Sequence, residues 1–195
     1  MKRLQKGLFL LLFVFSGIGL ASNNARAAFY IVESIADRQT TKKQQTPVWC
    51  WAAAIEMVLA SGKVMWSQVD IVNRVKGFPK LETASSGEIT QMLNSWNFDY
   101  NGKIWRSKAK YYQGALPASV LIHELKNQWP VIVTYSTGPA SGHAVVVYAA
   151  LTSATSPEIK LIYYFDPFTG KKETVFPDEF KEKITNSWAV RVVSQ

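Results

Sequence analysis

Few residues in this chain are of a type that can carry out chemistry. The sequence holds one cysteine, Cys50, and two histidines, of which His143 follows a glycine and opens a run of β-branched and aromatic residues. Asp166 precedes a proline, which biases its backbone toward extended geometry and places its carboxylate at the end of a predicted strand. In chain order the three supply a nucleophile, a base and a group that orients the base. These are the components of thiol-based nucleophilic catalysis.

Each of the three also has a purely structural interpretation. Cys50 stands at the start of an apolar segment, where the positive end of a helix would favour a thiolate, but a small core residue would fit there as well. His143 could be a hydrogen-bonded structural histidine, and Asp166 an ordinary turn residue. The other histidine, His123, lies within a predicted helix and is expected on a solvated face.

The residues around Cys50 suggest further parts of a site. Gln44 and Gln45 precede it by six and five positions, and a side-chain amide there could donate to an oxyanion beside the Cys50 backbone N–H. Trp49 and Trp51 flank the cysteine and are candidates for the wall of a substrate groove. One cysteine and two histidines are too few for a convincing zinc site, so we expect no metal and no cofactor.

Hydrophobic periodicity divides the chain into helices followed by strands. We expect helices over 49–60, 67–75, 86–96 and 118–129, and strands over 28–33, 131–135, 143–151, 159–165 and 188–193. The helix over 49–60 is apolar on nearly every face, with Glu56 as its only charge, which is typical of a helix buried all round. The order of elements predicts an α+β fold with a largely antiparallel sheet.

Four segments together resemble the papain-like cysteine peptidases. They are Gln44-Gln-Thr-Pro-Val-Trp-Cys-Trp-Ala-Ala, Trp129-Pro-Val-Ile-Val, Gly142-His-Ala-Val-Val-Val-Tyr and Asp166-Pro. Within about residues 40–170 the chain is most similar to the short bacterial branch related to bacteriocin-leader peptidases and plant-pathogen avirulence peptidases.

This resemblance implies a fold and a set of roles. The fold would have an N-terminal helical lobe, with a central Cys-bearing helix, packed on a C-terminal antiparallel sheet. Cys50 would be the nucleophile, His143 the base and Asp166 the orienting residue. The family spacing of six residues points to Gln44 as the oxyanion donor, with Gln45 as its rival. The papain signature has a second cysteine at the position of Pro47, and its cysteine and histidine lie further apart. The lobes should therefore be trimmed, and papain's substrate subsites are not carried over.

The pattern of residues at the N-terminus is typical of an export signal. Basic residues precede an apolar run over 8–20, which is too short for a comfortable membrane span of ~20 residues. Small residues then favour cleavage after Ala27, with Ala21 as the rival site. We therefore expect a signal peptide over 1–27 and one domain over 28–195. The protein would be periplasmic or secreted, with no stable membrane anchor after cleavage; an uncleaved anchor is the alternative.

The charge pattern narrows the class of partner. The formal net charge of +8 includes four basic residues within 1–27, and the other basic residues occur in small groups typical of solvated faces. We therefore expect no nucleic acid partner.

The stretches 46–55, 134–151 and 161–170 around the three candidate residues contain Asp166 as their only charge. An exported peptidase acting on peptides or proteins is the leading hypothesis. A cell-wall amidase or isopeptidase with the same triad, and a non-catalytic binding module, are the alternatives.

Overall fold

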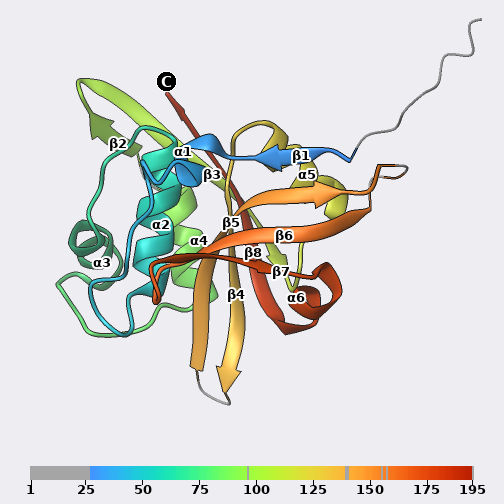
Figure 1. The fold of residues 1–195 in the computed structure, drawn as a ribbon. Helices are drawn as coiled ribbons and strands as arrows, with labels where there is room; N and C mark the ends of the chain where they lie inside the picture. Colours follow the sequence, from blue (N-terminus) through green and yellow to red (C-terminus); the bar gives the residue numbers. More distant parts are fainter. Residues whose placement is uncertain (1–26, 96, 139–140, 155, 157, 195) are drawn as a thin grey trace, which may run out of the picture.

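The computed structural model describes residues 27–95, 97–138, 141–154, 156 and 158–194, so the predicted signal peptide lies almost entirely outside the described residues. The described residues form six helices and one sheet of eight strands (Figure 1). The strands are β1 (Phe29–Ile31), β2 (Asn97–Tyr100), β3 (Lys103–Gln113), β4 (Val131–Gly138), β5 (Ser141–Thr152), β6 (Ile159–Asp166), β7 (Lys171–Val175) and β8 (Ile184–Ser194). The helices are α1 (Glu33–Ala36), α2 (Cys50–Ser61), α3 (Gln68–Lys76), α4 (Ser86–Asn94), α5 (Ala118–Lys126) and α6 (Pro177–Lys183).

The sheet is antiparallel, with strand order β2-β3-β8-β4-β5-β6-β7, and β1 pairs with β5. The last strand, β8, lies between β3 and β4 and so joins the end of the chain to its middle. In this register Thr134 of β4 pairs with Asn186 of β8 on one side and with Ala144 of β5 on the other. The register thus brings three distant segments together beside His143.

Helix α2 is the central element of the core. Its first eleven residues, from Cys50 to Ala60, are all buried, and it packs against β5, β4 and β8. Gly62 at its end shows how closely it approaches the sheet, because an added Cβ would lie 2.3 Å from Cβ of Val192 in β8. Helices α2, α3 and α4 gather at one side of the sheet, on the left in Figure 1. At the other end of α2, Cys50 lines a cleft together with Thr134 of β4 and Ala144 of β5.

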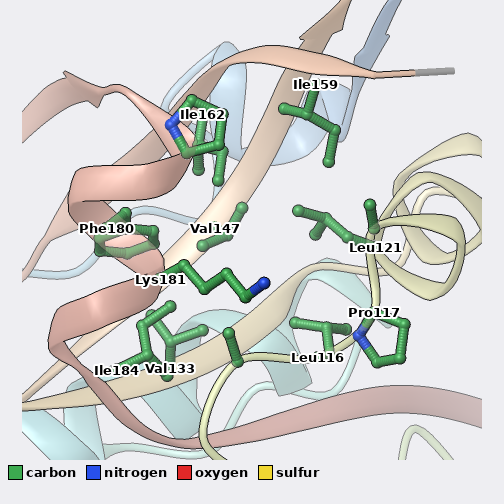
Figure 2. Close-up of a pocket in the computed structure, with 13 residues that line it drawn as sticks. Leu116, Pro117, Leu121, Val133, Val147, Ile159, Ile162, Phe180, Lys181 and Ile184 are labelled. Atoms are coloured by element: carbon green, nitrogen blue, oxygen red, sulfur yellow. The ribbon is translucent and has the colours of Figure 1, made fainter. Parts of the chain in front are cut away.

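Helices α5 and α6 cover the opposite side of the sheet (Figure 1). Between them lies an apolar cavity of about 350 Å³, into which Val133 and Val147 project from the sheet and Phe180 from α6 (Figure 2). Side chains alternate along a strand, so the neighbour Thr134 faces the α2 side instead. Lys181 of α6 is the only charged residue among those that line this cavity, and Cys50, His143 and Asp166 are not among them, so the cavity is separate from the candidate triad.

The predicted α+β class is confirmed, with helices first and an antiparallel sheet after them. All four predicted helices are present, although the one expected over 118–129 ends at Lys126, where Gln128 adopts a left-handed backbone with φ 64°. Pattern reasoning missed β2, β3 and β7 and the short helices α1 and α6. Strand β3 has only Ser107 fully buried and many charged residues, so it lacks the apolar run used to find the others. Among the described residues, no helix combines the length and apolar character that a membrane span requires.

Candidate active site

Cys50 is the first residue of α2 and is buried, with 7% of its surface exposed. The peptide N–H groups of a helix's first turn have no carbonyl one turn earlier to bond, and they carry the positive end of the helix dipole. Negative charge on the sulfur, or on an oxygen beside it, is stabilised there. The position therefore suits a thiolate and leaves the Cys50 N–H available as a donor.

His143 lies near the start of β5, opposite Tyr135 of β4. Its Nε2 is 2.7 Å from Oδ1 of Asp166, the last residue of β6, and its ring also interacts with the Cys50 thiol. Because Asp166 occupies Nε2, Nδ1 is the nitrogen left for the sulfur. A register shift in the β4–β8 pairing falls between Thr134 and Tyr135, next to the His143 position, and such shifts re-aim side chains. The structure thus brings together the three residues predicted to form the triad.

Asp166 is itself held in place. Its Oδ1 accepts a second hydrogen bond, 2.8 Å long, from the backbone N–H of Phe168. The Phe168 ring is exposed and meets the His143 ring edge-on, with 6.3 Å between centroids, while Tyr135 meets it edge-on at 5.5 Å. The two aromatic rings thus pack edge-on against the His143 ring and limit the space in which it can move.

The electrostatics of the triad favour a charged histidine. Burial lowers the pKa of His143, but interactions with Asp166 and Cys50 outweigh it and raise the pKa from 6.5 to about 9. Burial likewise raises the pKa of Asp166, but the bonds from His143 and from the Phe168 N–H hold it below its ordinary value. Burial and the nearby Asp166 raise the pKa of Tyr135 to about 12, which keeps that phenol neutral. At neutral pH the site therefore holds an imidazolium beside the Cys50 sulfur.

A cleft of about 170 Å³ opens at Cys50 and His143, between the helices and strands β4, β5 and β8. Trp51, one of the two predicted groove residues, lines it. Trp49 is buried, and its indole N–H donates to the Lys80 carbonyl at 2.8 Å, so its groove role stays a prediction. The described residues that line the cleft include no Asp, Glu, Lys or Arg.

The two glutamines differ in environment. Gln44 is half-buried, its backbone N–H donates to the Pro167 carbonyl at 2.9 Å, and its Nε2 donates to the Thr46 carbonyl at 2.7 Å. Its Oε1 is buried and has no hydrogen-bond partner among the described residues. An amide group has two N–H bonds, so the Thr46 bond fixes its plane and leaves one N–H to donate. Gln45 is exposed, and neither glutamine is among the described residues that line the cleft. Gln44 as the oxyanion donor, with Gln45 as its rival, therefore stays a prediction.

Sequence patterns did not predict the polar cluster that forms part of the cleft lining. Asn186 Nδ2 donates to Oγ1 of Thr134 at 3.0 Å and of Thr185 at 3.1 Å, and its Oδ1 accepts from the Tyr111 hydroxyl at 2.7 Å. These residues come from β3, β4 and β8 and meet through strand register alone. Only the pairing of β8 with β3 and β4 could have identified them.

Comparisons with known proteins agree with this geometry. The family model described as "Papain-like cysteine protease AvrRpt2" matches residues 32–185. Among solved structures, the peptidase domain of Streptococcus ComA, a bifunctional ABC transporter involved in a quorum-sensing pathway, has a TM-score of 0.52 and 16% sequence identity. The match covers 79% of this chain and 97% of that one. No curated protein matches the sequence. The ComA likeness supports the papain-like fold, and the family match spans most of the chain. The protein belongs to the papain-like cysteine protease AvrRpt2 family.

Proposed function

We propose that this protein is an exported cysteine peptidase that cleaves peptide bonds with Cys50, His143 and Asp166. The observation that carries the proposal is that His143 bonds to Asp166 at 2.7 Å while it interacts with Cys50 at the opening of a cleft. Membership of a cysteine protease family supports the same reading. A structural cysteine in the core would need neither the histidine nor the cleft.

Each residue has a distinct part in the proposed reaction. The Cys50 thiolate attacks the carbonyl carbon of the substrate, and the resulting oxyanion accepts hydrogen bonds from the Cys50 N–H and the Gln44 amide. The His143 imidazolium gives its proton to the leaving amine as the C–N bond breaks, which leaves a thioester on Cys50. Neutral His143 then takes a proton from water, and the hydroxide that forms hydrolyses the thioester. Asp166 stays ionised throughout and holds the ring.

The walls of the cleft favour a peptide over a cell-wall substrate. Its lining is aromatic, aliphatic and neutral polar, with Trp51, Ile89 and Trp188 on the α2 and α4 side. An amidase acting on peptidoglycan stem peptides would need to pair the charged groups of diaminopimelate and D-amino acids. Apart from Cys50 and His143 themselves, these walls offer no ion pair for those groups, whereas an extended peptide with apolar or neutral side chains can desolvate against them.

Export is proposed from the basic and apolar pattern of the N-terminal segment together with the place where the sheet begins. The Ala28 N–H donates to Oγ1 of Thr152 at 3.3 Å, and the Ala28 carbonyl accepts from the Thr152 N–H at 2.8 Å. Cleavage after Ala27 would leave these sheet contacts intact. Cleavage after Ala21 would leave six extra residues before them.

The test incubates the purified protein separately with unfolded casein and with purified sacculi, beside a Cys50→Ala control. We expect mass spectrometry to detect casein fragments with the native protein and none with the variant. Release of stem-peptide fragments from sacculi with casein untouched would reassign the enzyme as an amidase. No release from either substrate would reject the catalytic proposal and favour a binding module.

A further inference from the structure

A short segment, Lys42–Thr46, carries Gln44 past the active site; we call it the Gln44 strap. One side of the strap contacts the triad turn: the backbone N–H of Gln44 donates to the carbonyl of Pro167, which directly follows Asp166. This single bond of 2.9 Å ties the proposed oxyanion donor to the turn that carries the proposed orienting carboxylate.

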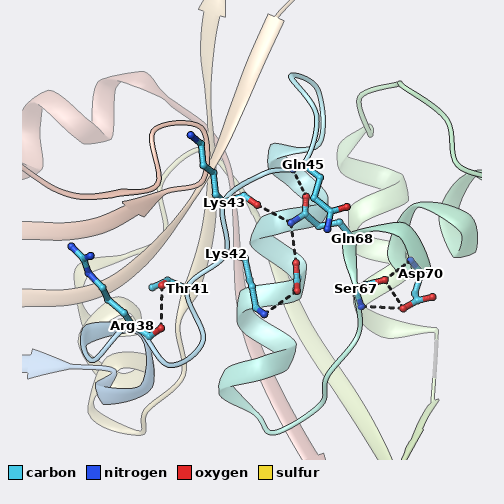
Figure 3. A network of polar contacts seen from close by, with 9 residues as sticks. Arg38, Thr41, Lys42, Lys43, Gln45, Ser67, Gln68 and Asp70 are labelled. Carbon is cyan, nitrogen blue, oxygen red and sulfur yellow. Dashed lines mark hydrogen bonds and ion pairs between the residues drawn. The ribbon is translucent and has the colours of Figure 1, made fainter.

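The other side of the strap is held by one side chain, Gln68 of α3. Its Oε1 accepts from the Gln45 N–H at 2.8 Å, and its Nε2 donates to the Lys43 carbonyl at 3.0 Å (Figure 3). The carboxamide thus bonds the backbone groups on both sides of Gln44, as a neighbouring β-strand would. Gln68 is only 1% exposed, which is unusual for a long polar side chain.

Glu56 of α2 fixes the orientation of that carboxamide. Its Oε2 accepts the second Nε2–H of Gln68 at 2.9 Å, and its Oε1 lies 3.4 Å from Nζ of Lys42. The partners of Gln68 are two acceptors on its nitrogen and one donor on its oxygen, so the amide cannot turn over without losing all three bonds. Glu56 is the single charge of the helix that begins at Cys50, and it is buried, with 9% of its surface exposed.

We propose that Gln68, oriented by Glu56, is a positioning residue that sets the Gln44 amide relative to Cys50. The inference rests on the proposed oxyanion role of Gln44. Gln68 touches neither substrate nor thiol. It joins the helix that carries the nucleophile to the strap that carries the donor, and Pro167 joins the strap to the triad turn. Oxyanion stabilisation depends on donor placement within a fraction of an ångström, so releasing the strap weakens the transition state more than substrate binding.

The first test compares Gln68→Met with the native protein on labelled casein. Methionine has a similar length but cannot make the three hydrogen bonds. We expect kcat to fall about 10- to 100-fold with KM changed less than threefold. Alkylation of Cys50 by iodoacetamide should stay within twofold of the native rate, because the Cys50–His143 pair is intact. A kcat within twofold of native, or a loss confined to KM, would overturn the proposal.

The second test places Gln68→Met in a Gln44→Ala background. If Gln68 acts through Gln44, the second substitution should lower kcat no further once the donor is gone. If Gln68→Met lowers kcat by the same factor in both backgrounds, Gln68 does not act through Gln44, and the positioning proposal fails. If Gln44→Ala alone leaves kcat unchanged, the oxyanion role itself fails, and that result is distinct from failure of the positioning proposal.

Two variants separate this effect from general destabilisation. Ser107→Ala removes a buried hydrogen bond of 2.7 Å to the Leu93 carbonyl, away from the strap, and should lower the melting temperature while kcat holds. Glu56→Met carries the test if Gln68→Met does not fold, because it has a similar side-chain length and removes the oxygen that accepts from Gln68 Nε2. Its loss of kcat should also vanish in the Gln44→Ala background. A loss that persists there would contradict the proposal.

Discussion

The charge of Asp166 sets the protonation state of His143, and Asp166→Asn isolates that effect. Asparagine keeps the volume and can still accept from Nε2, so the ring stays aimed while the charge is lost. The desolvation of the charged ring is then opposed by fewer favourable interactions, and the pKa of His143 should fall from about 9 toward its ordinary value of 6.5.

The expected size of the effect follows from those two values. At pH 8 a histidine with a pKa of about 9 is about 90% protonated, whereas one with a pKa of 6.5 is about 3% protonated. The catalytic acid is the protonated ring, so Asp166→Asn should lower kcat/KM by up to about 30-fold at pH 8 and by less than about twofold at pH 6. The alkaline limb of the native profile should lie near pH 9 and move toward acid in the variant.

The assay is the initial rate of labelled casein cleavage at low substrate concentration from pH 5 to 10. Asp166→Ala is the comparison, because it removes the bond as well as the charge and should add a loss that does not depend on pH. An equal ratio of native to Asp166→Asn activity at pH 6 and pH 8 would refute the reasoning. Asp166 would then act only by orientation.

Three further predictions concern the donor, the core and export. Gln44→Ala should lower kcat by about two to three decades with little change in melting temperature, and Gln45→Ala should have a small effect; the reverse ranking in steady-state kinetics would show that the donor is misassigned. Gly62→Ala should destabilise the fold by about 1–3 kcal/mol in urea unfolding, because its Cβ would overlap Val192, and Val192→Ala should restore part of the loss; a Gly62→Ala variant as stable as native would contradict such close packing. N-terminal sequencing of exported protein should begin at Ala28, and a start at position 22 would support the rival cleavage site.

The sequence was most informative where a single element carries its own signal. The uniformly apolar run after Cys50 predicted a buried helix, and α2 is buried along its first eleven residues. The β-branched runs at His143 and before Asp166 predicted two strands, and these proved to be neighbours in the sheet. Local composition is enough for such elements because burial on all sides, or on one face, dictates the residue types.

Other features depend on contacts between distant segments, which local patterns do not encode. The cluster around Asn186 exists because β8 inserts between β3 and β4. Local patterns did not single out Gln68 within the helix expected over 67–75, and its bonds to the Gln44 strap and to Glu56 explain its burial. Spacing favoured Gln44 over Gln45 only through the family resemblance, whereas the structure separates them by burial and by the bond to Pro167.

The central claim is that Cys50 and His143 act as one catalytic unit. The most direct measurement is the rate of peptide-fragment release from casein by the native protein, by Cys50→Ala, by His143→Ala and by the double variant. We predict that each single substitution lowers the rate about as far as the double one does, since neither residue works without the other. Cleavage by Cys50→Ala at the native rate, or losses that multiply in the double variant, would contradict this account.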